Sequence, residues 1–421
     1  MDNTLRNPAI GRPFSRERLR LAADQLAMAT AVSIPWSTSA TGVLIVLWLC
    51  ALLPTLDRAT IGRELATAAG GLPLALWACA ALGMLWADAS WGERLAGIGG
   101  YHKLLAVPLL LAQFRRSGRG LQVAGLYLAS VIALLALSWG MVLWPGLQAA
   151  CCPKAAPGVP VKDYIAQSGE FVACAFVLLY FAGQAARQGR KTIAAAAVVL
   201  AGGLLTSVAY VATGRTALVV IPVLLLILGL RTRGWRGVVS FSTVGLVLAS
   251  TAWISSPYLR ERVLRVGADV EQFQVGDFET SSGQRLAFWT RSIRLIEQAP
   301  LVGHGTMTHQ EIFRRSAVGS TGITARITAN PHNQVFAIAI QLGLLGAGLL
   351  VAMWTAHLLL FCGKSLTAWI GLVIVVQNIV SSLFNSHLLD FTQGWTYVFG
   401  VGVLGGALLR GQSSLDGAAR S

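Results

Sequence analysis

The chain has few charged residues. Only 12% of its 421 residues are Asp, Glu, Lys or Arg, whereas 55% are hydrophobic, and the mean hydropathy is +0.63. A soluble globular domain carries charge on about a quarter of its residues. Apolar segments of about 20 residues, the length that crosses a bilayer as a helix, recur from end to end. These properties exclude a soluble domain and predict an all-α polytopic membrane protein.

Acidic residues are especially scarce. The chain has 18 Asp and Glu against 33 Lys and Arg, which gives a formal net charge of +15. Such an excess is common in proteins that bind nucleic acid. Here the basic residues stand between apolar segments, in short loops and one long loop, so we expect contact with membrane lipids and no nucleic acid.

The six cysteines do not form a metal-binding pattern. Four lie in or beside apolar segments, and the adjacent Cys151 and Cys152 would form only a strained bridge. No GxSxG, HExxH, Walker or GxGxxG motif occurs in a fitting context. Two acidic pairs, in 269–271 and 277–279, keep a metal-dependent sugar transferase open as an alternative, but we expect no metal and no cofactor.

Twelve apolar segments are candidate membrane spans. They cover residues 21–36, 41–56, 72–88, 102–114, 120–144, 166–186, 192–212, 216–230, 236–255, 333–360, 366–384 and 393–410. With this number of spans, both termini lie on one side. Short loops on that side hold 19 Lys and Arg, whereas the opposite short loops hold 5. Because Lys and Arg accumulate on the cytoplasmic side, we predict that both termini are cytoplasmic.

The predicted spans divide the chain into three parts. Residues 1–255 hold spans one to nine, residues 256–332 form one long extracytoplasmic loop, and residues 333–421 hold spans ten to twelve and a cytoplasmic tail. The nine basic residues of the long loop are all Arg. The loop is too long for a plain connector, so we expect it to fold into short helices over the spans.

Two helices are expected in the long loop. Pro257 starts the first, which runs to about Gln272, and Ser281 or Ser282 caps the second, which runs from Gly283 to about Gln298. The apolar stripe of the second helix is expected to be Leu286, Trp289, Ile293 and Ile296.

Arginines at two turns suit recognition of phosphate. Arg215 lies in Thr213-Gly214-Arg215-Thr216 between two apolar segments, where its guanidinium suits phosphate oxygens and Gly214 permits close approach of backbone. Arg285 lies at a helix start, where free N–H groups also attract anions. The alternatives are lipid headgroup contact for Arg215 and an ion pair with a loop carboxylate for Arg285.

Arg262 and Arg265 form a further pair. They stand one helical turn apart and therefore share a face of the first loop helix. Arginine offers bidentate contacts to phosphate that lysine does not, so an all-Arg loop can neutralise a diphosphate without a metal. The alternative is a solvated or headgroup-facing helix.

Asn330-Pro331-His332-Asn333 precedes the tenth span. Asn330 is expected to cap a helix with Pro331 in its first position. His332 would then lie in the first turn, where the helix dipole disfavours imidazolium and keeps the ring available as a base. The alternative is a histidine that only caps the helix or anchors it at the interface. His387 and Asp390, in the last extracytoplasmic turn, are candidates for the same cavity or for a structural role.

Motifs of the second half of the chain occur together in a characteristic order. They are Thr213-Gly214-Arg215-Thr216, Ser282-Gly283-Gln284-Arg285 with Trp289, Pro300-Leu301-Val302-Gly303-His304-Gly305, and Pro331-His332-Asn333 continuing into Gln341-Leu342-Gly343-Leu344-Leu345-Gly346. This set resembles the O-antigen ligase and polymerase superfamily of bacterial membrane enzymes, and most of all the O-antigen ligases.

The resemblance implies a function and a set of roles. The donor would be a glycan on undecaprenyl diphosphate, the acceptor a sugar hydroxyl of lipid A–core, and the transfer metal-independent and inverting. The active site would face the periplasm from the bacterial inner membrane. His332 would be the base, and Arg215 and Arg285 would bind the diphosphate, with Arg265 as a further carry-over. Asn333, Arg262 and Gly214 form a second tier.

Two other functions remain open at this stage. An O-antigen polymerase or a protein O-oligosaccharyltransferase of the same superfamily would use the same residues with another acceptor. A transporter of lipid-linked sugars is a rival from a different class. Such proteins carry ionisable groups near the bilayer midplane and often repeated halves, whereas here Asp24, Glu170 and His357 are the main ionisable groups in spans and no repeat is evident.

Overall fold

The computed structural model describes residues 15–274, 281–319 and 325–418, and helices dominate these ranges. All twelve predicted segments fall on helices. These are α1 (Arg16–Ser33), α2 (Thr38–Leu52), α4 (Ala68–Gly83), α6 (Ala106–Arg116), α7 (Gly120–Leu143), α9 (Tyr164–Arg187), α10 (Lys191–Tyr210), α11 (Arg215–Ser255), α15 (Gln334–Leu360), α16 (Leu366–Ser382) and α17 (Phe391–Ala418). Uninterrupted apolar sequence favours helices because they satisfy every backbone group within the segment.

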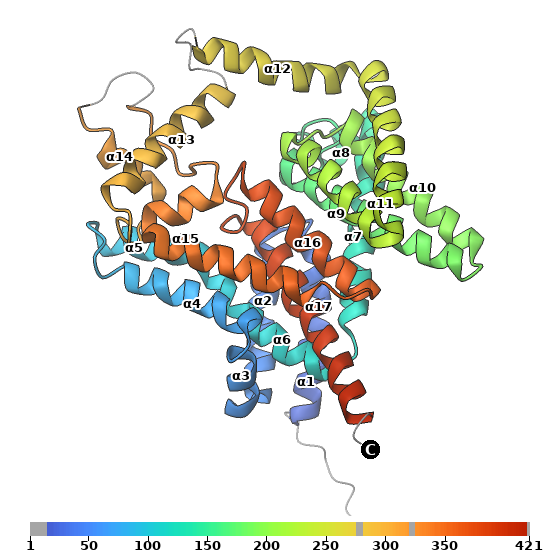
Figure 1. Cartoon of the computed structure of the whole chain (residues 1–421), viewed down its shortest axis with the longest axis horizontal. Helices are drawn as coiled ribbons and strands as arrows, with labels where there is room; N and C mark the ends of the chain where they lie inside the picture. Colours follow the sequence, from blue (N-terminus) through green and yellow to red (C-terminus); the bar gives the residue numbers. More distant parts are fainter. Residues whose placement is uncertain (1–14, 275–280, 320–324, 419–421) are drawn as a thin grey trace, which may run out of the picture.

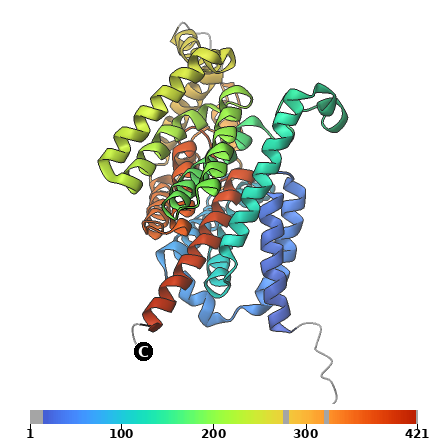
Figure 2. The same ribbon diagram turned by 90° about the vertical axis from the view of Figure 1, so that its right-hand side faces the viewer.

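The remaining elements are short. Between the long helices lie η1 (Leu53–Thr55), α3 (Arg58–Leu65), α5 (Trp91–Ile98), η2 (Gly99–Leu105) and α8 (Pro145–Cys151). The long loop folds into α12 (Pro257–Gln274), α13 (Ser281–Gln298) and α14 (His309–Ser316). The two helices predicted there are confirmed, and α14 is an addition. In Figures 1 and 2, α12 lies at the end of the molecule opposite the C-terminus.

The prediction of a polytopic helical membrane protein is confirmed in its coarse form. Within the described residues, seven helices are long and apolar enough to cross a membrane, or eight if the bent pair α3 and α4 forms one span. α16 has 17 residues and α6 has 11, so α6 reaches spanning length only together with α5 and η2. The count of twelve spans stays a prediction.

The eighth and ninth predicted segments form a hairpin inside α11. The backbone leaves the helical conformation at Arg233 (φ −141°, ψ 15°) and Gly234 (φ 61°, ψ −144°). A Cβ at Gly229 would lie 2.7 Å from the backbone nitrogen of Val238, and one at Gly245 would lie 2.7 Å from Leu225. The two halves of α11 therefore pack against each other in opposite directions, as two separate spans would.

The tenth predicted segment falls on α15, but the helix is not continuous within it. α15 breaks at Gly343, where φ is +63°. Residues 300–305 fill the break, because Pro300 O accepts from Leu344 N (2.8 Å) and His304 N donates to Ile340 O (2.9 Å). A Cβ at Gly343 would lie 2.3 Å from the Leu301 carbonyl carbon, so a larger residue would clash there. Two of the motifs that carry the family resemblance thus hold each other through their backbones.

The buried face of α13 differs from the expected stripe. Phe288, Ser292 and Leu295 are buried, whereas Ile293 is 46% exposed. Phe288 meets Phe313 of α14 edge to face, with 5.8 Å between ring centroids. The side of α13 that carries Phe288 packs against α14 and α15. Which side of the helix is buried therefore depends on partners that are distant in sequence.

Candidate active site

The turn before α11 is packed tightly against the start of α9. Gly214 is the residue before the first helical residue, Arg215. A Cβ at Gly214 would lie 2.3 Å from Ser168 Oγ, so the close approach expected of this glycine is real. Thr213 is fully buried, and its N–H donates to Tyr258 Oη of α12 (3.4 Å). Arg215 therefore begins its helix where α9, α11 and α12 meet.

Arg262 of α12 lies against two tyrosines at this junction. The centre of its guanidinium is 5.0 Å from the ring centroid of Tyr164 and 5.4 Å from that of Tyr258. Tyr164 is the first residue of α9, so its ring joins α9 to α12. Aromatic faces stabilise the cation and fix its direction.

Arg285 of α13 is electrostatically linked to the same junction. Burial lowers the pKa of Arg285, and the charge of Arg215 lowers this pKa further. The charge of Arg215 therefore acts on a second, partly buried positive charge at Arg285. An anion with several oxygens would relieve this repulsion.

Arg265 lies one helical turn after Arg262 on α12, as expected, but its partners differ. Its side chain is 63% exposed and forms an i,i+4 ion pair with Glu261, which is 60% exposed. An exposed pair of this kind contributes little. Of Arg262 and Arg265, it is Arg262 that contacts the tyrosines beside Arg215.

His332 lies just before α15, not in its first turn. Its φ is +55°, which is outside the helical region. Asn333 is the cap, because its Oδ1 accepts from the N–H groups of Val335 (2.9 Å) and Phe336 (3.1 Å). The expected cap by Asn330 is therefore wrong. Asn330 Oδ1 instead accepts from His332 N (2.8 Å), which stabilises the left-handed turn.

The ring of His332 sits between α13 and the loop that joins α16 to α17. It stacks on Phe288 with 6.3 Å between centroids, and Nδ1 is 3.2 Å from Asn385 Oδ1. Burial lowers the pKa of His332, as does the charge of Arg285, while Asn385 and Asp390 oppose the shift. A neutral ring was expected from the helix dipole, but burial and Arg285 are its causes here.

Arg285 is thus the link between the arginines and the histidine. The charge of Arg215 lowers the pKa of Arg285, and the charge of Arg285 lowers the pKa of His332. The arrangement combines an anion-binding surface with a neutral imidazole, which suits proton abstraction next to a negatively charged leaving group.

Sequence reasoning did not single out three polar residues of this site, Asn385, Tyr164 and Tyr258, and it expected Asn330 only as a helix cap. Their roles depend on hydrogen bonds and ring contacts across the fold. The single available signal was the neighbourhood of Asn385 to His387 and Asp390, which were singled out as candidates for the cavity. His387 is buried, and its Nδ1 lies 3.3 Å from Asp390 Oδ2.

A metal centre finds no support in the part of the chain that the structure describes. No group of three or more His, Cys, Asp and Glu side chains there could hold a metal ion. The acidic pair in 277–279 and the side chains of the pair in 269–271 lie outside the described residues. His304 Nε2 and His309 Nε2 lie 2.8 and 2.9 Å from the backbone oxygens of Leu295 and Ala337, as structural histidines do.

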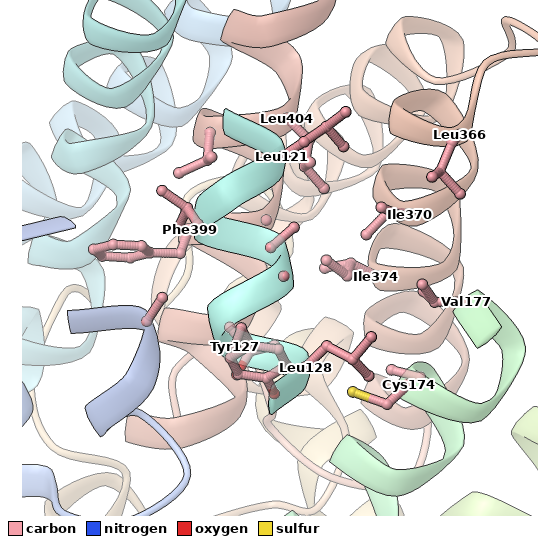
Figure 3. Close-up of a pocket in the computed structure, with 18 of the residues that line it drawn as sticks. Leu121, Tyr127, Leu128, Cys174, Val177, Leu366, Ile370, Ile374, Phe399 and Leu404 are labelled. Atoms are coloured by element: carbon pink, nitrogen blue, oxygen red, sulfur yellow. The ribbon is translucent and has the colours of Figure 1, made fainter. Parts of the chain in front are cut away.

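An apolar cavity of about 290 Å³ lies between α7, α9, α16 and α17. Figure 3 shows Leu128, Ile374 and Phe399 among its lining residues. It shares Ile374 and Thr396 with a smaller polar pocket that is also lined by Thr392, two residues after Asp390.

Comparison with known proteins agrees with the motifs. Residues 196–351 match the sequence model of the family described as O-antigen ligase. The matched range contains Arg215, Arg262, Arg285 and His332, as well as both motifs that meet at the break in α15. No curated protein matches the chain significantly.

Proposed function

We propose that this chain, a member of the O-antigen ligase superfamily through residues 196–351, is a ligase that transfers O-antigen glycan from undecaprenyl diphosphate to a sugar hydroxyl of lipid A–core. The observation that carries the proposal is that Phe288, one helical turn after Arg285 on α13, stacks on the ring of His332 with 6.3 Å between centroids. The charge of Arg215 in turn lowers the pKa of Arg285. Arg215, Arg285 and His332 come from different elements, and together they offer what the transfer needs.

The arginines would bind the donor diphosphate and stabilise the charge that grows on it. Arg215 and Arg285 provide two forked donors at one place, and a held diphosphate leaves without a general acid. Arg262, fixed by Tyr164 and Tyr258, is the third candidate. A diphosphate-binding role for Arg265 is implied only by the family resemblance, because its side chain is exposed and forms an ion pair with Glu261.

His332 would be the general base. As the acceptor oxygen forms its bond to the anomeric carbon, His332 takes the hydroxyl proton, and the bond from that carbon to the diphosphate oxygen breaks. Attack from the side opposite the leaving group inverts the anomeric centre. A positioned base of this kind contributes about 10²–10⁴-fold to the rate. No step requires a metal or another cofactor.

The second-tier residues would support this geometry without taking part in it. Asn333 caps α15 and so holds the turn that carries His332. Gly214 lets the turn before Arg215 lie against Ser168. The apolar cavity in Figure 3 would accept part of a lipid chain, such as the polyprenyl tail of the donor.

We place the protein in the bacterial inner membrane with both termini in the cytoplasm, as the distribution of Lys and Arg supports. The helices α12, α13 and α14, at the end of the molecule opposite the C-terminus, would then face the periplasm. The donor glycan and lipid A–core would meet on that side.

The test is a choice of acceptor by purified protein in lipid vesicles. The same lipid-linked donor is supplied with lipid A–core, with no second acceptor, or with a pilin-like protein. We expect transfer to lipid A–core. Chain lengthening of the donor would identify a polymerase, and glycosylated protein would identify a protein O-oligosaccharyltransferase. Donor crossing the vesicle membrane without any transfer would identify a transporter and refute the enzyme.

A further inference from the structure

A histidine base works through one ring nitrogen, so the position of its single proton decides whether it can act. In neutral imidazole one nitrogen carries hydrogen and the other carries the lone pair. The group that faces Nδ1 therefore determines whether Nε2 is available to accept a proton. In His332 that group is Asn385, whose Oδ1 lies 3.2 Å from Nδ1.

The direction of the Asn385 amide follows from its neighbour Asn330. Asn330 Oδ1 accepts from the backbone N–H of His332 (2.8 Å), which can only donate, and from the hydroxyl of Ser386 (2.7 Å). The other end of the Asn330 amide is therefore the NH₂ group. It donates to Asn385 at 2.7 Å, so the Asn385 atom that it meets is an oxygen.

The far end of Asn385 agrees with this direction. Its Nδ2 lies 3.4 Å from Asp390 Oδ2, an acceptor that requires a donor. The oxygen of Asn385 thus faces Asn330 and His332, and an oxygen beside His332 Nδ1 requires that Nδ1 carries the hydrogen. The lone pair is left on Nε2.

Buried groups from two other elements hold the loop that carries Asn385. Lys103, which is 6% exposed, donates to the backbone oxygens of Leu389 (2.9 Å) and Asp390 (2.6 Å). Gln334 at the start of α15 is fully buried, and its Oε1 accepts from Leu388 N (2.9 Å). Asn385 is therefore positioned before substrate arrives, as a base-orienting residue must be.

We propose that Asn385 is the positioning residue of His332: oriented by Asn330 and Asp390, it holds the proton on Nδ1 and reserves Nε2 for the acceptor hydroxyl. The tautomer follows from the hydrogen bonds alone, whereas the catalytic consequence rests on the proposed function. An amide performs this task without adding a negative charge beside the ring, so the imidazole keeps its low affinity for a second proton.

The direct test is nitrogen NMR of the protein labelled with ¹⁵N-histidine in lipid nanodiscs at pH 8. The His332 signals are identified by their loss in His332→Asn. We expect a protonated Nδ1 and an unprotonated Nε2 in the native protein, and a mixture of both tautomers in Asn385→Ala. Gln393→Ala, a polar change in the first turn of α17, is the matched control and should leave the signals unchanged. A native His332 with its proton on Nε2 would overturn the proposal.

Kinetics provide a second readout. We expect Asn385→Ala to lower kcat by about 10–100-fold, while KM for the donor changes less than about threefold. Asn385→Asp keeps an acceptor beside Nδ1 and should recover most of kcat at pH 8. The added negative charge acts in the same direction as that of Asp390 and opposite to those of Arg285 and His387, so it should raise the pKa of His332. The acid limb of the pH profile of this variant should therefore move to higher pH. Native kcat in Asn385→Ala would refute the positioning role.

The experiments distinguish a failure of the base assignment of His332 from a failure of the positioning role of Asn385. If His332→Asn transfers glycan normally, the base assignment fails, whatever the tautomer. If His332→Asn is inactive but native His332 shows no preference for Nδ1–H, the positioning role of Asn385 fails alone. Should Asn385→Ala not fold, the native tautomer and the pH profile of Asn385→Asp still decide the question.

Discussion

Replacement of His332 by asparagine is the sharpest test of the proposed base. Alanine would be a poor choice, because φ at this position is +55° and a non-glycine residue there costs about 1–3 kcal/mol. Asparagine tolerates this conformation better than other side chains. The backbone bonds of the turn, from His332 N to Asn330 and from Trp289 Nε1 to His332 O (3.2 Å), do not involve the imidazole and should survive.

The expected effects on stability and on catalysis differ in size. The imidazole contributes one hydrogen bond to Asn385 and one stacked contact with Phe288, so its loss should destabilise the fold by about 1–2 kcal/mol. Loss of a general base should lower kcat by about 10²–10⁴-fold. This corresponds to about 3–5 kcal/mol of transition-state stabilisation. A folded but nearly inactive protein is therefore expected.

The assay measures initial rates of glycan transfer to lipid A–core in vesicles, with donor held well above its KM. Thermal unfolding followed by fluorescence provides the control for folding. The residual rate of His332→Asn should also lose the acid limb of the pH profile. If the folded variant retains kcat within about threefold of the native value, His332 is not a general base.

Five further outcomes are expected. Arg215→Lys and Arg285→Lys should each reduce transfer at least tenfold, because a point charge replaces a forked donor; native rates in both would indicate contact with lipid headgroups instead. Arg262→Lys should reduce transfer more than Arg265→Lys, since Arg262 lies on two tyrosines and Arg265 is 63% exposed; the reverse order would favour the carry-over from the family. Transfer requires neutral His332, and burial and the charge of Arg285 lower the pKa of this ring from that of an ordinary histidine, so activity should persist at mildly acidic pH and fall in more acidic buffer. Arg285→Gln removes one cause of the low pKa, and the acid limb of its residual activity should move to higher pH; an unmoved limb would mean that another group titrates. Finally, EDTA should leave transfer unchanged, and a loss that added metal restores would return attention to the acidic pairs of the long loop.

The helical elements could be predicted because their signals are local. Each of the twelve apolar segments falls on a helix, and Pro257 and Ser281 mark helix starts that the structure contains. Even the turn between the two halves of α11 could be predicted, because three arginines and a glycine separate the two apolar segments there. Hydropathy and capping residues act over a few neighbouring positions, so the sequence alone is sufficient to predict the helices that depend on them.

The break in α15 shows where such signals end. Residues 333–360 form an uninterrupted apolar run, and Gly343 alone does not predict a break. The break depends on residues 300–305, which supply the hydrogen bonds that the opened helix would otherwise lose. The cap at the start of this helix was predicted three residues too early for a related reason, because Asn330 is engaged by Ser386 and Asn385.

By itself, the sequence determined that this is a helical membrane protein, that the basic residues of its one long loop are all arginine, and which motifs belong together. These properties depend on composition and on the order of residues. Only the tertiary structure decided which arginine on α12 reaches the junction and which residue faces His332. Arg262 and Arg265 are equivalent in pattern and differ in their partners. Asn385 meets His332 across 53 positions of the chain, and a hydrogen bond over that separation exists only once the helices have packed.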